Sequence, residues 1–149
     1  MTRIHVTADY DAPPDAVWRT VEEVDSHVEW MGDAETIRFL TEQTSGVGTR
    51  FECVTKIGPI RLTDLMEITE WEPGRAMGVR HTGVVTGTGR FTIEPLDDGQ
   101  RTRFSWEEEL VFPWWLGGPV GSAVGGPLVL RRIWRGNLRR LKTLAERSP

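Results

Sequence analysis

The chain has 149 residues, 38 % of them hydrophobic and 27 % charged, and a formal net charge of −4. This length and composition are typical of one soluble globular domain spanning residues 1–149, and the single cysteine, Cys53, excludes an intrachain disulfide. The N-terminal residues include acids where a secretory signal needs an apolar core, so we expect a cytoplasmic protein.

The charge is unevenly distributed along the chain. Residues 131–149 hold seven arginines or lysines and one acid, a local charge of +6, which leaves −10 on residues 1–130. A basic end can bind nucleic acid or anionic lipid. Its arginines recur at the spacing of a solvated helix face, however, and we therefore expect no nucleic-acid partner.

The first elements are a strand and two short helices. Residues 3–10 alternate apolar and polar side chains, which predicts a half-buried strand. Pro13 and Pro14 favour a helix start, because proline lacks the N–H that has no partner there. Ser26 and Glu29 match a capping box, which predicts a second short helix containing Trp30 and Met31.

Six further segments alternate with period two and are separated by short turns, which join antiparallel neighbours. They comprise residues 36–44, 49–57, 60–71, 75–82, 86–96 and 101–112.

Residues 110–130 contain no charge, and a stretch of this length could cross a bilayer. Its three prolines and five glycines make a poor membrane helix, so we expect no stable membrane insertion. We predict a loop carrying Trp114 and Trp115, which either latches onto the protein or contacts a membrane peripherally. A long helix then begins at Pro119, is kinked at Pro127, and presents an apolar stripe to the sheet.

These elements resemble a known fold family. The segments that carry the resemblance are ADYDAPPDAVWRTVEEVDSHVEWM, WEPGRAMGVRH, FSWEEELVF and the helix from residue 119. Together they resemble the helix-grip fold of the START-like (SRPBCC) superfamily, and most of all its polyketide cyclase/dehydrase and lipid-transport group. The resemblance implies an α+β fold, in which a curved seven-stranded antiparallel sheet wraps around the long C-terminal helix and two short helices follow the first strand. It implies no catalytic motif, since the superfamily shares none.

Three ionisable residues fall on the face of the sheet that should meet the helix. The short turns place Cys53 opposite Asp64, Asp64 opposite His81, His81 near Gly87, and Gly89 near Glu108. Asp64, His81 and Glu108 are therefore the candidate catalytic residues, with the two glycines leaving a gap between them. Alternatively, the three residues lie at a hydrated pocket mouth or pair with Arg80 or Arg90.

The remaining inward positions are mostly apolar and predict a cavity between sheet and helix. The expected ligand-binding residues are Trp30, Phe51, Cys53, Met66, Val79, Gly87, Gly89, Phe91, Trp106, Leu110, Trp115, Leu130 and Trp134.

The leading hypothesis is a protein that binds a hydrophobic or aromatic small molecule, such as a lipid, polyketide or quinone-like compound. The alternative is a polyketide aromatase/cyclase in which His81, Asp64 and Glu108 transfer protons. A third possibility is an interaction protein acting through Trp114, Trp115 and the arginine-rich helix. Three scattered histidines form no zinc set and no phosphate loop is present, so no metal or cofactor is expected. The oligomeric state stays open.

Overall fold

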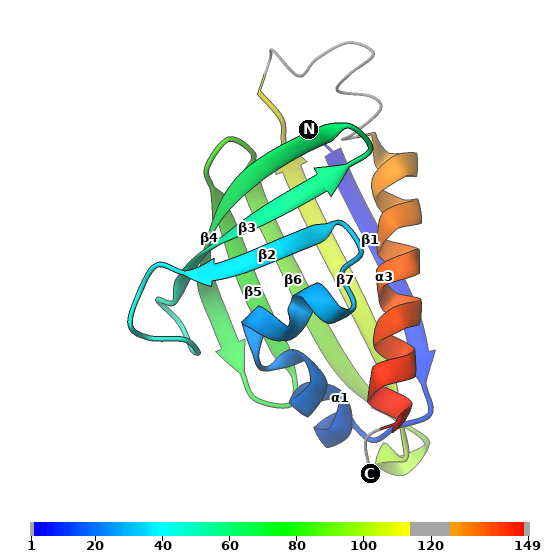
Figure 1. Ribbon diagram of the computed structural model, residues 1–149. Helices are drawn as coiled ribbons and strands as arrows, with labels where there is room; N and C mark the ends of the chain where they lie inside the picture. The colour runs from blue at the N-terminus through cyan, green and yellow to red at the C-terminus, as the bar shows by residue number, and fades with distance from the viewer. Residues whose placement is uncertain (1, 114–125, 148–149) are drawn as a thin grey trace.

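A computed structural model describes residues 2–113 and 126–147, in which a curved antiparallel sheet wraps around a long C-terminal helix (Figure 1). This is the predicted α+β helix-grip architecture. The elements are β1 (Thr2–Tyr10), α1 (Pro14–Val21), η1 (Val24–Glu29), β2 (Ala34–Phe39), β3 (Arg50–Ile57), β4 (Ile60–Glu72), β5 (Ala76–Thr82), β6 (Thr86–Leu96), η2 (Asp97–Gly99), β7 (Arg101–Val111) and α3 (Pro127–Arg147).

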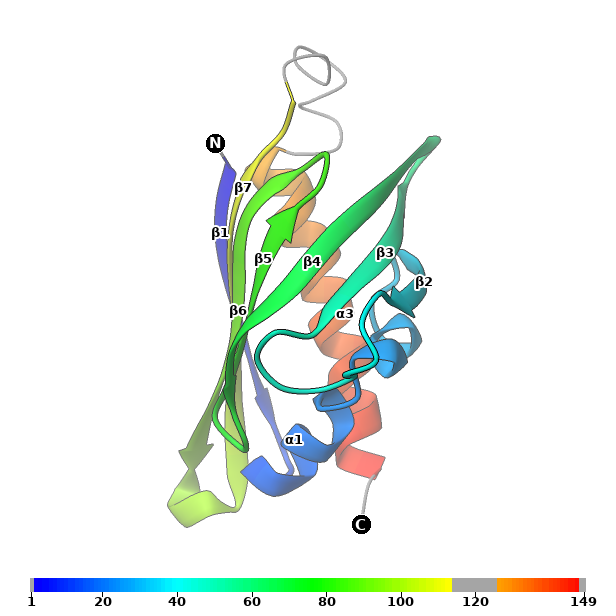
Figure 2. The same ribbon diagram turned by 90° about the vertical axis from the view of Figure 1, so that its left-hand side faces the viewer.

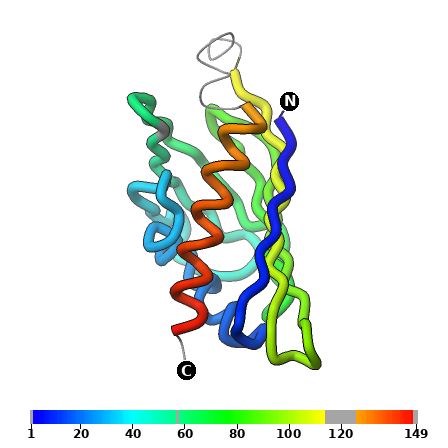
Figure 3. Tube along the Cα trace, turned by 90° about the vertical axis from the view of Figure 1, so that its right-hand side faces the viewer, coloured from blue at the N-terminus to red at the C-terminus, as the bar shows by residue number. Residues whose placement is uncertain are grey.

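The seven strands lie in the order β1-β7-β6-β5-β4-β3-β2, and every neighbouring pair is antiparallel. The first strand thus pairs with the last, while β2 forms the opposite edge. Figures 2 and 3 show α3 running alongside β1 on the concave side of the sheet. We call the side of the sheet that faces α3 the inner face and the opposite side the outer face.

Two short helices follow β1 as expected, but the second one, η1, starts differently and ends at Glu29, so the prediction that it contains Trp30 and Met31 is wrong. Pro13 precedes the first residue of α1, Pro14, and the helix buries Trp18 and Val21. The predicted capping box is wrong, because η1 is a 3₁₀ helix that begins at Val24 and has Ser26 inside it. The Ser26 hydroxyl donates to the carbonyl of Glu23 at 2.6 Å, a local bond that competes with the capping role.

The C-terminal helix starts later than predicted. Pro127 is the first residue of α3, where its missing N–H costs nothing, so the expected kink at Pro127 is wrong for the described helix. The predicted start at Pro119 and the loop with Trp114 and Trp115 fall outside the described residues. The expected apolar stripe of α3 is buried and comprises Leu130, Trp134, Leu138, Leu141 and Ala145.

A buried hydrogen bond fixes the position of α3 along β1. The hydroxyl of Tyr10, at the end of β1, donates to the carbonyl of Leu138 at 2.8 Å. Burial raises the pKa of this phenol far above its ordinary value, so it stays a donor. Over the residues that the structure describes, no helix is both long and apolar enough to cross a membrane.

Most of the predicted register is confirmed, with one correction. Cys53 lies opposite Asp64, and Gly87 lies opposite His81. Asp64 was expected opposite His81, but Met66 is there instead. The turn is centred on Gly74, later in the chain than expected, with Glu72 opposite Ala76, which alone would place Glu67 opposite His81. The bulge between Ile68 and Glu70 then moves the pairing back by one residue, to Met66. A shift of two keeps the same side chains on the inner face.

Candidate ligand-binding site

The interior between the sheet and η1 contains an apolar cavity of about 40 Å³. Its walls come from the inner face of the sheet and from the residues around η1. The predicted ligand-binding residues among them are Phe51, Cys53, Met66, Val79, Phe91 and Trp106, and the others are Val24, His27, Met31, Ile37 and Met77. The volume holds a few water molecules, whereas pockets for small organic ligands are usually about 300–1,000 Å³.

Aromatic side chains close the cavity on the side of α3. Trp106 of β7 stacks on Trp134 of α3 with ring centroids 4.2 Å apart, and it also contacts Phe91 at 4.7 Å. Trp30, after η1, reaches Trp134 edge-on at 6.2 Å. This aromatic cluster links sheet, helix and η1. Trp30 and Trp134, like Leu110 and Leu130, are buried but lie outside the cavity wall, and Trp115 lies outside the described residues.

The expected gap at the two glycines is filled. A Cβ atom on Gly89 would overlap the ring of Trp106, so the indole occupies the space that the missing side chain leaves. A Cβ atom on Gly87 would overlap the carbonyl oxygen of Glu109, and Gly87 has φ of 133°, a region closed to other residues. The prediction of an open space here is wrong, because the indole covers β6 at Gly89 and backbone crowds Gly87.

Glu108 is a buried acid next to this aromatic cluster. Its side chain is only 7 % exposed, and its carboxyl oxygen accepts a hydrogen bond from the indole N–H of Trp106 at 2.6 Å. Burial raises the pKa of Glu108 to about 8, and the negative charges of Asp33 and Asp64 act in the same direction. At neutral pH this group is therefore mainly a carboxylic acid, which can donate a proton.

Asp64 is the second buried acid. Thr55 donates to one carboxylate oxygen at 3.2 Å, and the other oxygen has no partner in the described part of the chain. Burial raises the pKa of Asp64 to about 6, so it is largely ionised at pH 7. Asp64 also helps raise the pKa of the neighbouring Cys53 to about 12, mainly a result of burial, which makes this thiol a poor nucleophile.

His81 is the third candidate and is 8 % exposed. Neither ring nitrogen has a hydrogen-bond partner within residues 2–113 and 126–147. Burial lowers the pKa of His81 to about 4, so the imidazole is neutral at pH 7, with one donor and one acceptor nitrogen.

The three candidates share the inner face without forming a hydrogen-bonded triad. His81 and Asp64 lie diagonally on neighbouring strands, and Glu108 lies two strands from His81 with β6 between them. The alternative in which they pair with Arg80 or Arg90 is wrong. Those arginines bind Glu67 and Glu70 on the outer face. None of the three lines the small cavity, although their neighbours in the sheet do.

A fourth acid near the site was missed from the sequence. Asp33 follows η1, and its carboxylate accepts a hydrogen bond at 3.2 Å from the amide of Asn137, a fully buried residue on α3. Burial raises the pKa of Asp33. The signal was present in the sequence, because Asn137 is a polar residue within the apolar stripe of α3. In the described ranges, no group of three or more His, Cys, Asp or Glu side chains could hold a metal ion.

His27 was also missed as a member of the cavity wall. Its ring nitrogen hydrogen-bonds the carbonyl of Val21 at 2.7 Å, and burial lowers its pKa to about 4. The donor in this bond is the neutral imidazole, which fits its contacts with the rings of Trp30 and Phe91. His27 is thus a satisfied structural histidine, unlike His81.

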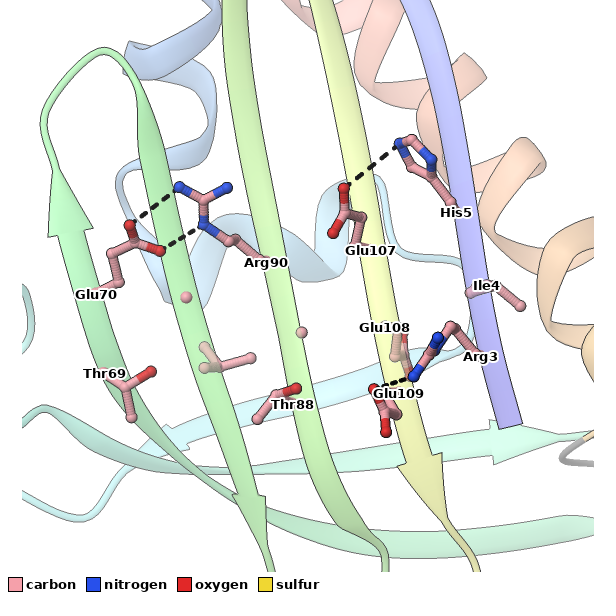
Figure 4. Close-up of a pocket in the computed structure, with 13 residues that line it drawn as sticks. Arg3, Ile4, His5, Thr69, Glu70, Thr88, Arg90, Glu107, Glu108 and Glu109 are labelled. Atoms are coloured by element: carbon pink, nitrogen blue, oxygen red, sulfur yellow. Dashed lines mark hydrogen bonds and ion pairs between the residues drawn. The ribbon is translucent and has the colours of Figure 1, made fainter. Parts of the chain in front are cut away.

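A larger hollow of about 550 Å³ lies on the outer face, but its charged groups already have partners (Figure 4). Glu70 binds Arg90, Glu107 faces His5, and Arg3 binds Glu109. These residues are also solvent-exposed, so a ligand would compete with both water and internal ion pairs. The inner face is the better candidate site.

Comparisons with known proteins agree with this architecture. A family model described as polyketide cyclase / dehydrase and lipid transport matches residues 1–146. The chain belongs to this family. Among curated proteins, no sequence matches significantly.

Solved structures of similar fold come from several bacteria. The Zhui aromatase/cyclase from Streptomyces sp. R1128 has a TM-score of 0.76 and 20 % identity, covering 97 % of this chain and 93 % of its own. DR_A0006 from Deinococcus radiodurans has a TM-score of 0.73 and 14 % identity, covering 98 % of each chain. TTHA0849 from Thermus thermophilus has a TM-score of 0.72 and 17 % identity, covering 96 % of each chain. At these identities the likeness establishes the fold that this family member shares with them.

Proposed function

We propose that the protein binds a hydrophobic or aromatic small molecule between the inner face of the sheet and α3. The observation that carries this proposal is His81, a buried imidazole with no hydrogen-bond partner in the described chain. Leaving such a group unpaired costs roughly 1–3 kcal/mol, and a hydroxyl or carbonyl group of a ligand would remove that cost. The family to which the chain belongs supports the same function.

Ligand entry would require the cavity wall to rearrange, because about 40 Å³ is too small for an aromatic ring system. Met31, Met66 and Met77 all line the cavity. Methionine is unbranched and adapts its shape more readily than other apolar residues. We therefore expect binding to displace these side chains, with little change in the strands that carry Met66 and Met77.

The test is calorimetric titration with 2-naphthalenemethanol, an uncharged aromatic alcohol. Wild-type protein should bind one equivalent, and His81→Phe should weaken binding about fivefold, the effect of one buried hydrogen bond. His5→Phe is the matched control, since His5 lies on the outer face, and it should leave the affinity unchanged. No saturable binding to wild-type protein, or an equal loss in both variants, would contradict the proposal.

A second candidate function is proton-transfer catalysis on a carbonyl compound, as in a polyketide cyclase. The observation that favours it is the pair formed by Glu108, a carboxylic acid at neutral pH, and His81, an unprotonated imidazole on the same inner face. An acid and a base in a buried site are what enolisation of a ketone requires. A fold neighbour carries the name aromatase/cyclase.

Deuterium exchange at the α-carbon of 1-tetralone, followed by NMR in D₂O, separates this function from simple binding. An enzyme should accelerate exchange above the buffer rate, and Glu108→Gln should lower the acceleration by roughly 100-fold. Glu107→Gln, the adjacent position on the outer face, should have no effect. Exchange at the buffer rate in wild-type protein would leave binding as the only function.

A further inference from the structure

The inner face is unusual in carrying acids without a matching cation. Asp64 and Glu108 are buried there, and their hydrogen-bond partners are neutral donors, Thr55 and Trp106. Asp33 lies nearby and accepts from the neutral amide of Asn137. The charged neighbours that influence Asp64 and Glu108 are other carboxylates, so this part of the interior has a negative potential.

In the described part of the chain, no cation forms an ion pair with Asp33, Asp64 or Glu108. Seven arginines of the sheet pair instead with acids on its outer face or at its edges, namely Arg3, Arg38, Arg61, Arg80, Arg90, Arg101 and Arg103.

Among the described residues, Arg140 is the one cation whose charge lowers the pKa of Asp33. Its guanidinium donates to the carbonyl of Trp30 at 2.9 Å and to the amide oxygen of Asn137 at 2.6 Å. It therefore ties α3 to the loop after η1, and its side chain is exposed. It does not contribute to the charge environment of Asp64 or Glu108.

The charge of a ligand's polar group determines whether the buried acids would repel it or form hydrogen bonds with it. A carboxylate would bring another negative charge beside Asp64 in a site of low dielectric constant, where repulsion is strong. An uncharged hydroxyl could donate to the free oxygen of Asp64 or to the unprotonated nitrogen of His81, or it could accept from the N–H of His81. An uncharged carbonyl could accept from the same imidazole.

We infer that the site selects hydrophobic molecules whose polar end is an uncharged hydroxyl or carbonyl group, and that it rejects carboxylates such as fatty acids. This inference rests on the proposed binding function and narrows its ligand class. The second observation behind it, besides the acids, is the buried and unpartnered imidazole of His81 in the described chain.

The experiment compares 2-naphthalenemethanol with 2-naphthoate at pH 7 by calorimetry, since both carry the same ring system and differ in charge. Wild-type protein should bind the alcohol at least tenfold more tightly. Asp64→Asn should reduce this preference to less than threefold by strengthening the binding of naphthoate. Glu107→Gln, which removes a carboxylate from the outer face, should leave the preference unchanged.

Each outcome decides a different question. Equal or tighter binding of naphthoate by wild-type protein would overturn the inference while leaving the binding function intact. A preference that is unchanged in Asp64→Asn would overturn the role of the interior charge. Should that variant fail to fold, repeating the comparison on wild-type protein at pH 5, below the pKa of Asp64 of about 6, removes the same charge and provides the same test. Failure of both compounds to bind would overturn the proposed function and the inference with it.

Discussion

The charged residues on the two faces of the sheet have different kinds of partner. On the outer face acids and arginines of different strands form ion pairs, such as Glu70 with Arg90 across β5 and Asp9 with Arg103 on the adjacent strand. On the inner face Asp64 and Glu108 have only neutral donors, and His81 has no partner in the described chain. The ion-paired groups of the outer face satisfy one another, whereas the inner face has polar groups without a partner in the described chain.

This difference bears on the stability of the fold, because exposed ion pairs and buried acids contribute to it in different ways. Exposed ion pairs contribute little to stability because water and salt screen them. Buried acids without a cation cost stability, since burial disfavours their charged form. A chain that keeps such groups among apolar residues loses stability at the inner face, and the proposed ligand-binding role would account for that cost.

The largest expected effect comes from the aromatic cluster that closes the inner face. Trp134 is buried and stacks on Trp106, so Trp134→Ala should lower the free energy of unfolding by about 3–5 kcal/mol. Urea denaturation measures this change. Arg135→Ala, the next residue on the exposed side of α3, should change stability by less than about 0.5 kcal/mol. Similar losses in both variants would mean that α3 does not pack on the sheet through Trp134.

The second effect concerns the close approach of β6 and β7. Gly87→Ala should cost about 2–3 kcal/mol, because alanine is strained at φ of 133° and its Cβ atom would overlap the carbonyl of Glu109. Gly99→Ala is the control, since Gly99 also has a positive φ, of 85°, but open space around its Cβ position. It should cost only about 1 kcal/mol in the same urea experiment. Equal costs would show that backbone conformation alone, and not the contact with β7, requires glycine at position 87.

The third effect is a dependence of stability on pH that arises from the inner face alone. The pKa of Glu108 is raised from 4.5 to about 8, so between these values the folded protein keeps a proton that the unfolded chain has lost. Stability therefore falls as pH rises through this range. His27 and His81, whose pKa values are lowered from 6.5 to about 4, act in the opposite direction, mainly below pH 6.5 and with a smaller contribution up to about pH 7.5. Between pH 6.5 and 8 the comparison of wild-type protein with Glu108→Gln, which keeps both histidines, therefore isolates Glu108.

In that window wild-type protein should lose about 1–2 kcal/mol of unfolding free energy. Glu108→Gln should remove most of the loss, and Glu107→Gln should retain it. Guanidinium denaturation at both pH values provides the measurement. A wild-type stability that rises between pH 6.5 and 8 would show that Glu108 is already ionised, and its role as an acid would be lost.

The inner face could be predicted from the sequence because side chains alternate strictly along a strand. This periodicity placed Asp64, His81 and Glu108 on the buried side, and a pairing error of two residues did not change the side. The partner of His81 was wrong because the turn between β4 and β5 is centred on Gly74, later than the expected pairing requires, and the one-residue bulge between Ile68 and Glu70 offsets this only in part. The ring of Trp106 over Gly89 depends on a side-chain rotamer, which periodicity does not specify. The Asp33–Asn137 contact joins positions 104 residues apart, and only the polar residue in the helix stripe hinted at it.

The smallest effect tests the outer face. The Glu70–Arg90 pair has two hydrogen bonds, at 2.6 and 3.1 Å, with side chains 32 % and 46 % exposed. A double-mutant cycle with Glu70→Ala and Arg90→Ala should give a coupling of about 0.2–1 kcal/mol, which should decrease further at about 1 M salt. A salt-independent coupling of several kcal/mol would mean that this pair is shielded from water. The outer face would then also contain a desolvated charged site, and the contrast on which the choice of the inner face depends would disappear.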